Sequence, residues 1–211
     1  PEEIADELAD LYLAQFGQQN GEVVVVNSAP EKRLKLWREA GVVPRGIDRE
    51  VVEALHRTHI GDDQDHEHIL SHAVRTALGD GWGWSMIATD VSDILFGTPA
   101  PILGEANLGV LKDDMVNVVV HGHEPTLSQM IVAASHDPEV IEYARAAGSN
   151  GVNLSGICCT ANEILMRQGI PAAGNFLHQE LSILTGSVEA MVVDVQCVMQ
   201  ALVGLAENFH T

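Results

Sequence analysis

Apolar residues recur at helical spacing through the first half of the chain. In segment 2–16, Ile4, Leu8 and Leu11 repeat at intervals of four and three, which is typical of an amphipathic helix. The same kind of pattern predicts four further helices, at about 30–40, 49–58, 66–78 and 86–96.

Capping and breaking residues refine this helical half. Ser28, Asp48 and Asp65 precede three of the helices and are expected to be their N-caps. The short apolar run 23–26 predicts an isolated strand, and the glycine-rich segment 80–84 predicts a turn. Apart from that one strand, the first half of the chain is therefore expected to be helical.

The pattern changes near the middle of the chain. Apolar runs that begin at Val116, Val152 and Ala190 predict strands. Helices are expected between and after them, at 125–134, 137–147, 161–168, 178–185 and 197–208. Because strands and helices alternate, the sequence predicts a helical segment over 1–112 followed by a Rossmann-like α/β domain with a parallel sheet over 113–211.

Each predicted strand is followed by a side chain that can bind a metal. His123 follows the first, Cys158 and Cys159 follow the second, and Cys197 follows the third. Because ligands bind outside the carboxyl ends of parallel strands, these side chains are expected to converge. One histidine with two or more cysteines suits a soft metal or an iron–sulfur cluster. The two adjacent thiols, at the start of a helix, are also expected to have a lowered pKa.

Each of these residues, taken singly, also fits a structural role. His121 and His123 are compatible with hydrogen bonds to their own loop, and the cysteines with burial in a core. Their recurrence at three successive strand ends favours convergence, because unrelated structural residues have no reason to share that position.

A second group of metal-capable residues lies in the helical half. His68 and His72 are four residues apart on one face of a predicted helix, a spacing that zinc sites use. The acidic run 62–65 beside them favours a solvated helix face instead. Zinc binding there is kept as an alternative.

Composition narrows the class of protein. The 211 residues are 46% hydrophobic but only 4% aromatic, which suits the aliphatic core of a parallel sheet. A formal charge of −19 argues against nucleic acid and anionic membranes as partners. Three cysteines, two of them adjacent, indicate a reducing, cytoplasmic compartment. No apolar run is long enough to predict a membrane span.

Several strings in the chain together resemble one family. His-Gly-His-Glu-Pro at 121–125, Gly-Ile-Cys-Cys-Thr at 156–160 and Asp-Val-Gln-Cys at 194–197 resemble the catalytic subunit of nickel-containing anaerobic carbon monoxide dehydrogenases. Further matching strings lie at 72–82, 93–99, 106–111 and 162–163. The resemblance covers essentially the whole chain, and the first two strings together are highly specific.

The resemblance implies the reversible oxidation of CO with water to CO2, two protons and two electrons. The family holds a buried nickel–iron–sulfur cluster, the C-cluster, through one histidine and five cysteines. Carried over by motif, its ligands here are His123, Cys159 and Cys197, which are then both catalytic and metal-binding. Cys158 is implied as a bystander or alternative ligand, and Asp80 as an aspartate near the cluster.

The resemblance also implies CO, CO2 and water as substrates, a ferredoxin-like electron acceptor and a homodimer, and it leaves open an acetyl-CoA synthase partner. The family's other three cysteine ligands, its acid/base lysine and the cysteines of its electron-transferring 4Fe–4S clusters have no counterpart in these 211 residues. We therefore expect a fragment of a longer enzyme that alone neither assembles a stable C-cluster nor oxidises CO.

Two rival hypotheses use the same residues. One is a hybrid-cluster-type protein that reduces hydroxylamine, from the same superfamily. The other is a non-catalytic scaffold that binds a single metal through His123, Cys159 and Cys197. The His-Gly-His-Glu-Pro string and the Gln196-Cys197 pair favour the carbon monoxide dehydrogenase hypothesis over the first of these.

Overall fold

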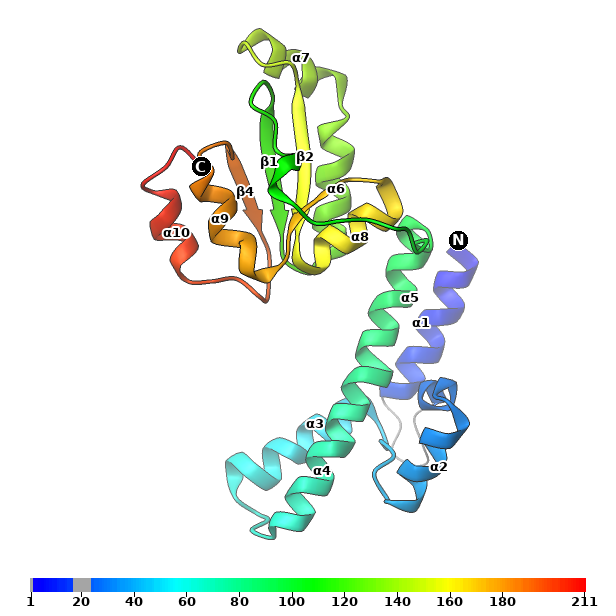
Figure 1. The fold of residues 1–211 in the computed structure, drawn as a ribbon. Coiled ribbons are helices and arrows are strands. Elements are labelled where there is room, and N and C mark those ends of the chain that lie inside the picture. The colour runs from blue at the N-terminus through cyan, green and yellow to red at the C-terminus, as the bar shows by residue number, and fades with distance from the viewer. Residues whose placement is uncertain (1, 17–23) are drawn as a thin grey trace. The chain divides into compact units, whose positions relative to one another are not determined.

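The computed structural model describes residues 2–16 and 24–211, which form two compact units, Pro1–Leu95 and Phe96–Thr211 (Figure 1). The first unit is helical and the second contains a parallel sheet, which confirms the predicted fold class. The assignment of separate domains to 1–112 and 113–211 stays a prediction. No helix in these described segments is both long and apolar enough to cross a membrane.

The first unit contains helical elements only, in the part of it that the structure describes. They are α1 (Glu2–Phe16), the 3-10 helix η1 (Val24–Ser28), α2 (Glu31–Glu39), α3 (Ile47–Leu55), the π-helix η2 (His56–Ile60), α4 (His66–Gly79), the π-helix η3 (Asp80–Trp84) and α5 (Ser85–Phe96). The strand predicted at 23–26 is wrong from Val24 on, and Val23 lies outside the described residues.

The N-cap predictions had mixed outcomes. Asp65 caps α4 as predicted, because its carboxylate accepts hydrogen bonds from the backbone N–H groups of Glu67 and His68. Asp48 lies inside the first turn of α3, which begins one residue earlier at Ile47. Ser28 ends η1, and α2 starts after Pro30 without a side-chain cap.

The predicted turn at 80–84 is also wrong, because α4, η3 and α5 follow one another without a break. A Cβ on Gly83 would lie 2.8 Å from the Ile47 side chain, so the absence of a side chain lets the helix approach α3 closely. Trp82 packs against Trp37, with ring centroids 5.7 Å apart, and joins the core around Leu34 and Ile47. Gly83 therefore serves packing within a helix.

The second unit is built on a four-stranded parallel sheet in the order β3-β2-β1-β4. Its strands are β1 (Val116–His121), β2 (Val152–Ile157), β3 (Ala172–Gly174) and β4 (Ala190–Val193). Val119 pairs with Ser155 on one side and with Met191 on the other, so β1 lies between β2 and β4. The predicted strands at Val116, Val152 and Ala190 are confirmed, and β3 was not predicted.

Helical elements precede and follow the strands of this unit. They are η4 (Leu108–Val110), α6 (Pro125–Ser135), α7 (Pro138–Ala146), α8 (Cys158–Gln168), η5 (Phe176–His178), α9 (Gln179–Leu184) and α10 (Ala201–Ala206). The predicted helices at 125, 137, 161 and 178 are confirmed. The helix predicted from Cys197 begins only at Ala201, because Cys197 has a left-handed backbone conformation with a φ of 51°.

Both faces of the sheet are covered. Successive residues of a strand point to opposite faces, and both Val119 and Val120 are fully buried. On one face, Val120 packs with Val132 of α6 and Ile164 of α8. On the other face, Val119 packs with Ile157 and Val188. This burial on both sides explains why the strands consist of nearly continuous apolar residues.

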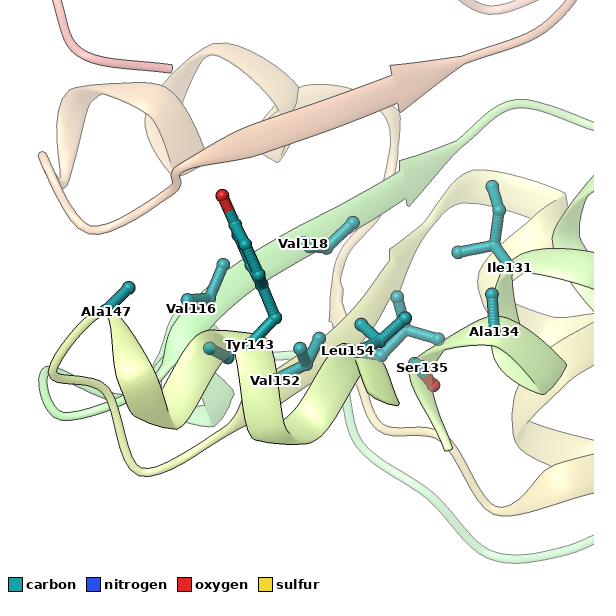
Figure 2. Close-up of a pocket in the computed structure, with 11 residues that line it drawn as sticks. Val116, Val118, Ile131, Ala134, Ser135, Tyr143, Ala147, Val152 and Leu154 are labelled. Atoms are coloured by element: carbon teal, nitrogen blue, oxygen red, sulfur yellow. The ribbon is translucent and has the colours of Figure 1, made fainter. Parts of the chain in front are cut away.

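An apolar cavity of about 360 Å³ lies between the sheet and helices α6 and α7 (Figure 2). Val116 and Val118 of β1, Val152 and Leu154 of β2, and Tyr143 of α7 are among the residues that line it. The cavity lies toward the start of β1 and β2, because Val116 and Val152 are the first residues of these strands. It is therefore separate from the strand ends that carry the cysteines.

Candidate metal centre

The metal-capable residues of the second unit follow three adjacent strands. β1 ends at His121, β2 at Ile157 and β4 at Val193, and β1 pairs with both of the others. Parallel strands present their carboxyl ends at one edge of a sheet. The loops that carry His123, Cys158 and Cys197 therefore meet there.

All three cysteines line one cavity of about 300 Å³. Cys158 is half-buried and packs against the core of Val119 and Ile157, whereas Cys159 and Cys197 are exposed. None of the three forms a disulfide. Small and apolar residues supply much of the remaining wall, including Ala106, Ala161, Ala172 and Gly174. The predicted convergence of the thiols is therefore present in the structure.

His123 lies against one of these thiols. Its Nε2 atom is 3.7 Å from the Sγ atom of Cys197. Its Nδ1 atom is 3.1 Å from the backbone oxygen of Val195, which can only accept a hydrogen bond. A neutral imidazole in this position carries its proton on Nδ1 and directs the Nε2 lone pair toward Cys197. Metal-binding histidines commonly have this arrangement, with one nitrogen held and the other available.

Asp194 connects the loop of His123 to the loop of Cys197. Its Oδ1 atom accepts from the backbone N–H of His123 at 2.7 Å, and its Oδ2 atom accepts from that of Glu124 at 2.7 Å. The N–H of Val195 also donates to Oδ1. A Cβ on Gly122 would lie 1.5 Å from Oδ1, so only glycine leaves room for this carboxylate.

Gln179 holds the Cys197 loop from the sheet side. Its side chain is fully buried, donates to the backbone oxygen of Cys197 at 3.0 Å, and accepts from the N–H of Met199 at 2.8 Å. The Oε1 atom also lies 2.9 Å from Nε2 of His121, so His121 donates there. His121 therefore supports the loop from within the core and does not face the cavity.

Strained backbone is concentrated at this site. Cys158, Gln196 and Cys197 have φ values of 66°, 62° and 51°, and among the residues that the structure describes they are the only non-glycine residues with positive φ. Such conformations are costly for ordinary residues and persist where surrounding contacts impose them, often at functional sites.

The two adjacent thiols, those of Cys158 and Cys159, have raised pKa values, which corrects the predicted lowering. Burial raises the pKa of Cys158 to about 11, and repulsion from Cys197 and Cys159 adds to the effect. Burial also raises the pKa of Cys159, with repulsion from Cys197 and Glu163. The position at the start of α8 is outweighed by these effects. A cation bound among the thiols would oppose this raising of the pKa, because its positive charge stabilises the thiolates.

The donor set therefore fits a soft metal centre. Thiolates and imidazole are the ligands that iron–sulfur clusters, nickel and zinc accept. Three thiols and one imidazole are present, the three cysteines line one cavity, and the histidine is oriented by its second nitrogen. Three thiolates are fewer than the four that an ordinary 4Fe–4S cluster takes. The residues fit part of the ligand shell of a cluster.

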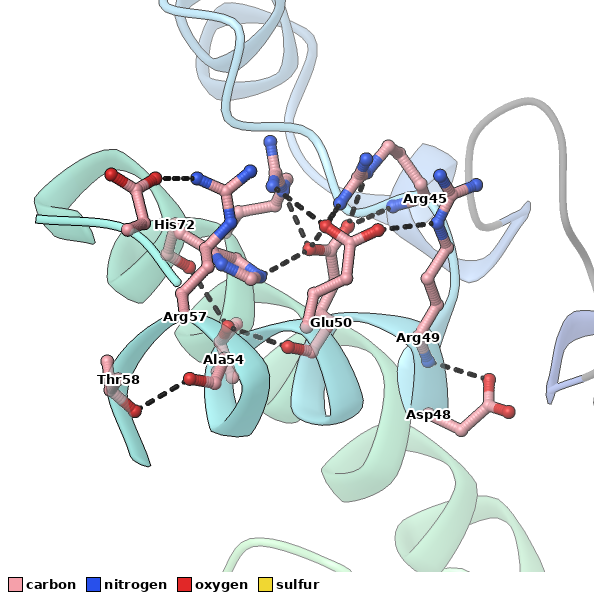
Figure 3. A network of polar contacts seen from close by, with 12 residues as sticks. Arg45, Asp48, Arg49, Glu50, Ala54, Arg57, Thr58 and His72 are labelled. Carbon is pink, nitrogen blue, oxygen red and sulfur yellow. Dashed lines mark hydrogen bonds and ion pairs between the residues drawn. The ribbon is translucent and has the colours of Figure 1, made fainter. Parts of the chain in front are cut away.

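The alternative site at His68 and His72 has a different environment, and Figure 3 shows the polar network around His72. His72 is buried beside Glu50, with Nε2 at 3.0 Å from Oε2 but out of line for a hydrogen bond. His68 has a largely exposed side chain and lies 3.6 Å from Asp63. The two histidines do line one cavity of about 200 Å³, together with Arg57, Ser71 and Arg75.

Arginines dominate this second cluster. Ligand atoms of Glu50, Glu53 and His72 lie within 4.8 Å of one another, a spacing that a metal ion could bridge. However, Glu50 already accepts hydrogen bonds from Arg45 and Arg75. Burial by itself would raise the pKa of Glu50, but these hydrogen bonds outweigh it and hold the pKa below its ordinary value. The guanidinium groups already bind the carboxylate oxygens, and their positive charge repels a cation. The cluster is therefore better explained as a buried ion-pair network.

Asp80 lies in the helical unit, as the first residue of η3. It lines a cavity of about 520 Å³ with Ile47, Ala77 and Trp84, among others. Its assignment to a cofactor stays a prediction.

Comparisons with known proteins agree with the motifs. A family model described as the Prismane/CO dehydrogenase family matches residues 1–211. Carbon monoxide dehydrogenase 1 of Methanosarcina acetivorans is 60% identical over 210 residues, which are 100% of this chain and 33% of the relative. The chain thus spans about a third of the length of this curated relative, and the same holds for a second one from Methanosarcina mazei.

Solved structures are similar over the same extent. A Ni-free carbon monoxide dehydrogenase from Thermococcus sp. AM4 aligns with a TM-score of 0.90 and 54% identity, over 99% of this chain and 33% of that one. An acetyl-CoA synthase/carbon monoxide dehydrogenase, described with NiZn- and NiNi-Fe4S4 clusters in its alpha subunits, aligns with a TM-score of 0.88 and 45% identity, over 99% and 31%.

Proposed function

Because the chain belongs to the Prismane/CO dehydrogenase family, we propose that it supplies part of the nickel–iron–sulfur centre of an anaerobic carbon monoxide dehydrogenase. The observation that carries the proposal is the gathering of three thiols around one cavity, with His123 Nε2 beside Cys197. In this proposal His123, Cys159 and Cys197 are the ligands. Cys158 is a neighbour or alternative ligand, and Asp80 lies near the centre.

The reaction would be the reversible oxidation of CO with water to CO2, two protons and two electrons. When bound, the metal centre would supply the redox and Lewis-acid chemistry. The chain's own residues would hold and surround it. Val195 fixes the imidazole of His123, and the small side chains of Ala106, Ala161 and Ala172 line the cavity beside the cysteines.

The activity as a whole belongs to a longer protein. A cluster needs its full set of thiolates, and this chain provides only three. We therefore propose that the remaining ligands lie outside the 211 residues and that the chain alone does not oxidise CO. In the longer protein, a cytoplasmic location, a homodimer and electron transfer to a ferredoxin-like acceptor extend the same proposal, as does association with an acetyl-CoA synthase.

The proposal is tested by anaerobic nickel, iron and sulfide analysis of the longer protein, beside its His123→Ala variant. We expect metal and sulfide in the parent and their loss in the variant. His136→Ala is a matched control, because His136 caps the end of α6 in the same unit through Val132 and should leave the metal content unchanged. Stoichiometric zinc without sulfide in all samples would contradict the proposal and favour a metal-binding scaffold.

A further inference from the structure

Asp194 lies at the junction between the loops that carry His123 and Cys197. Its backbone N–H donates to the oxygen of His121 at 3.1 Å, which continues the pairing of β1 with β4. Beyond this bond the main-chain pairing stops. Instead, both oxygens of the Asp194 carboxylate accept backbone N–H groups from the loop that follows β1, here called the β1 loop. The carboxylate thus replaces the missing backbone partners of that loop.

The β1 loop is shaped to receive this carboxylate. Gly122 has a φ of 137° and leaves open the space that a Cβ would otherwise take from Oδ1. This conformation aims the next two N–H groups, those of His123 and Glu124, at one side chain. The fit is specific, because every other residue at position 122 would collide with the carboxylate.

The orientation of His123 depends on the same short segment. Asp194 binds its backbone N–H, and the neighbouring Val195 binds its Nδ1 atom. The main chain and the ring of His123 are thereby both held by two consecutive residues. Cys197 follows two residues later, so one segment sets the positions of both members of the pair.

Cys197 has a second, independent support. Gln179 donates to the Cys197 backbone oxygen and accepts from the N–H of Met199. Loss of the Asp194 carboxylate would therefore release the His123 loop while leaving Cys197 attached to α9. Because the two loops have different supports, a substitution at Asp194 should affect His123 without displacing Cys197.

We propose that Asp194 is a positioning residue that holds His123 in place for metal binding, and this inference rests on the proposed function. A carboxylate suits the role because it offers only acceptors. An asparagine would direct its NH2 group at a backbone N–H, since three donors already converge on the two oxygen positions. Residues that orient a ligand in this way typically change metal affinity by about 10- to 100-fold when altered.

The test uses the longer protein with Asp194→Asn, and with Gly122→Ala as a second variant that displaces the carboxylate by collision. Nickel, iron and sulfide are measured per folded chain, together with the EPR spectrum of the reduced protein and the melting temperature. We expect metal per folded chain to fall about tenfold or more in both variants. Chains that retain metal should give an altered EPR signal.

Two comparisons make the outcome decisive. Asp137→Asn is the matched control, because Asp137 also accepts a backbone N–H, that of Glu139, but at the start of α7. It should lower stability slightly and leave metal per folded chain unchanged. If Asp194→Asn behaves like this control while His123→Ala loses the metal, the positioning role is overturned and the proposed function stands. If His123→Ala also keeps its metal, the proposed function fails.

Discussion

His123 Nε2 lies 3.7 Å from Cys197 Sγ, although 74 residues separate the two in the sequence. The contact arises because β1 and β4 are neighbours in the sheet and end at the same edge. Cys158 and Cys159 reach that edge from β2 on the other side of β1. Strand order therefore turns three distant motifs into one group of metal-capable side chains.

The two adjacent cysteines are expected to differ in importance. Cys159→Ser should remove most of the nickel, iron and sulfide from the longer protein, because a hydroxyl is a poor replacement for a thiolate with soft metals. Cys158→Ser should retain most of it, because Cys158 packs against the core beside Val119 and Ile157. Metal and sulfide analysis of both variants checks the assignment, and the reverse order of loss would refute it.

Gly156 at the end of β2 is expected to tolerate no side chain. A Cβ there would lie 2.6 Å from the Cα atom of Ala161, so α8 would have to shift. Gly156→Ala should cost about 1–3 kcal/mol of unfolding free energy through overpacking. Gly204→Ala, in α10 of the same unit and with open space around it, should be neutral or slightly stabilising. Chemical denaturation measures both, and equal effects would contradict the packing argument.

Gln179 is expected to stabilise the sheet edge as well as the cysteine loop. It is fully buried and bonds the Cys197 oxygen, the Met199 N–H and the Phe176 oxygen. Gln179→Leu would leave these groups unpaired and should cost about 1–3 kcal/mol for each group that water cannot reach. Gln168→Leu, on an exposed residue of α8 whose side chain bonds to Gln129, is the milder control. The denaturation midpoint should therefore fall further in Gln179→Leu than in Gln168→Leu.

The buried ion-pair network of the helical unit is expected to make the free energy of unfolding depend on pH in the acidic range. Burial opposes ionisation of Glu53, but its hydrogen bonds from Arg45 and Arg49 outweigh this and lower its pKa from 4.5 to about 2. The pKa of Glu50 is lowered for the same reason. The unfolded chain therefore takes up protons first, so stability is retained above pH 4.5 and is lost as the pH falls toward 2.

Glu50→Gln tests this network. Removing one partner of a buried ion pair leaves the arginines uncompensated and should cost about 3–5 kcal/mol at neutral pH. The variant should also lose less stability between pH 5 and pH 2 than the parent chain does, which thermal unfolding at several pH values measures. Glu67→Gln, on an exposed residue of α4, is the control and should follow the parent.

The strands that carry the site could be predicted because their apolar runs are long. β1, β2 and β4 begin where the sequence indicates, and the metal-capable residues follow them. β3 consists of Ala172, Ala173 and Gly174, three small residues with no alternation, so it has no periodic signal. It forms because Gly156 and Ile157 of β2 offer it a paired edge.

The supporting residues could not be predicted from local pattern. Asp194 follows a strand as a single acidic residue, and its role depends on N–H groups about 70 positions away. Gln179 starts a short helix and bonds a loop that the sequence assigned to another helix. The glycines in η3 suggested a turn, because the contact of Gly83 with Ile47 is visible only in three dimensions.

The most direct test of the account is anomalous diffraction from crystals of the longer protein, prepared anaerobically and measured at the iron and nickel edges. We predict anomalous peaks in the cavity lined by Cys158, Cys159 and Cys197, with a metal about 2.0–2.3 Å from His123 Nε2 or from a cysteine sulfur. The assignment would be contradicted if this cavity held no iron or nickel while the metal occupied another site at full occupancy, for example one at His68 and His72.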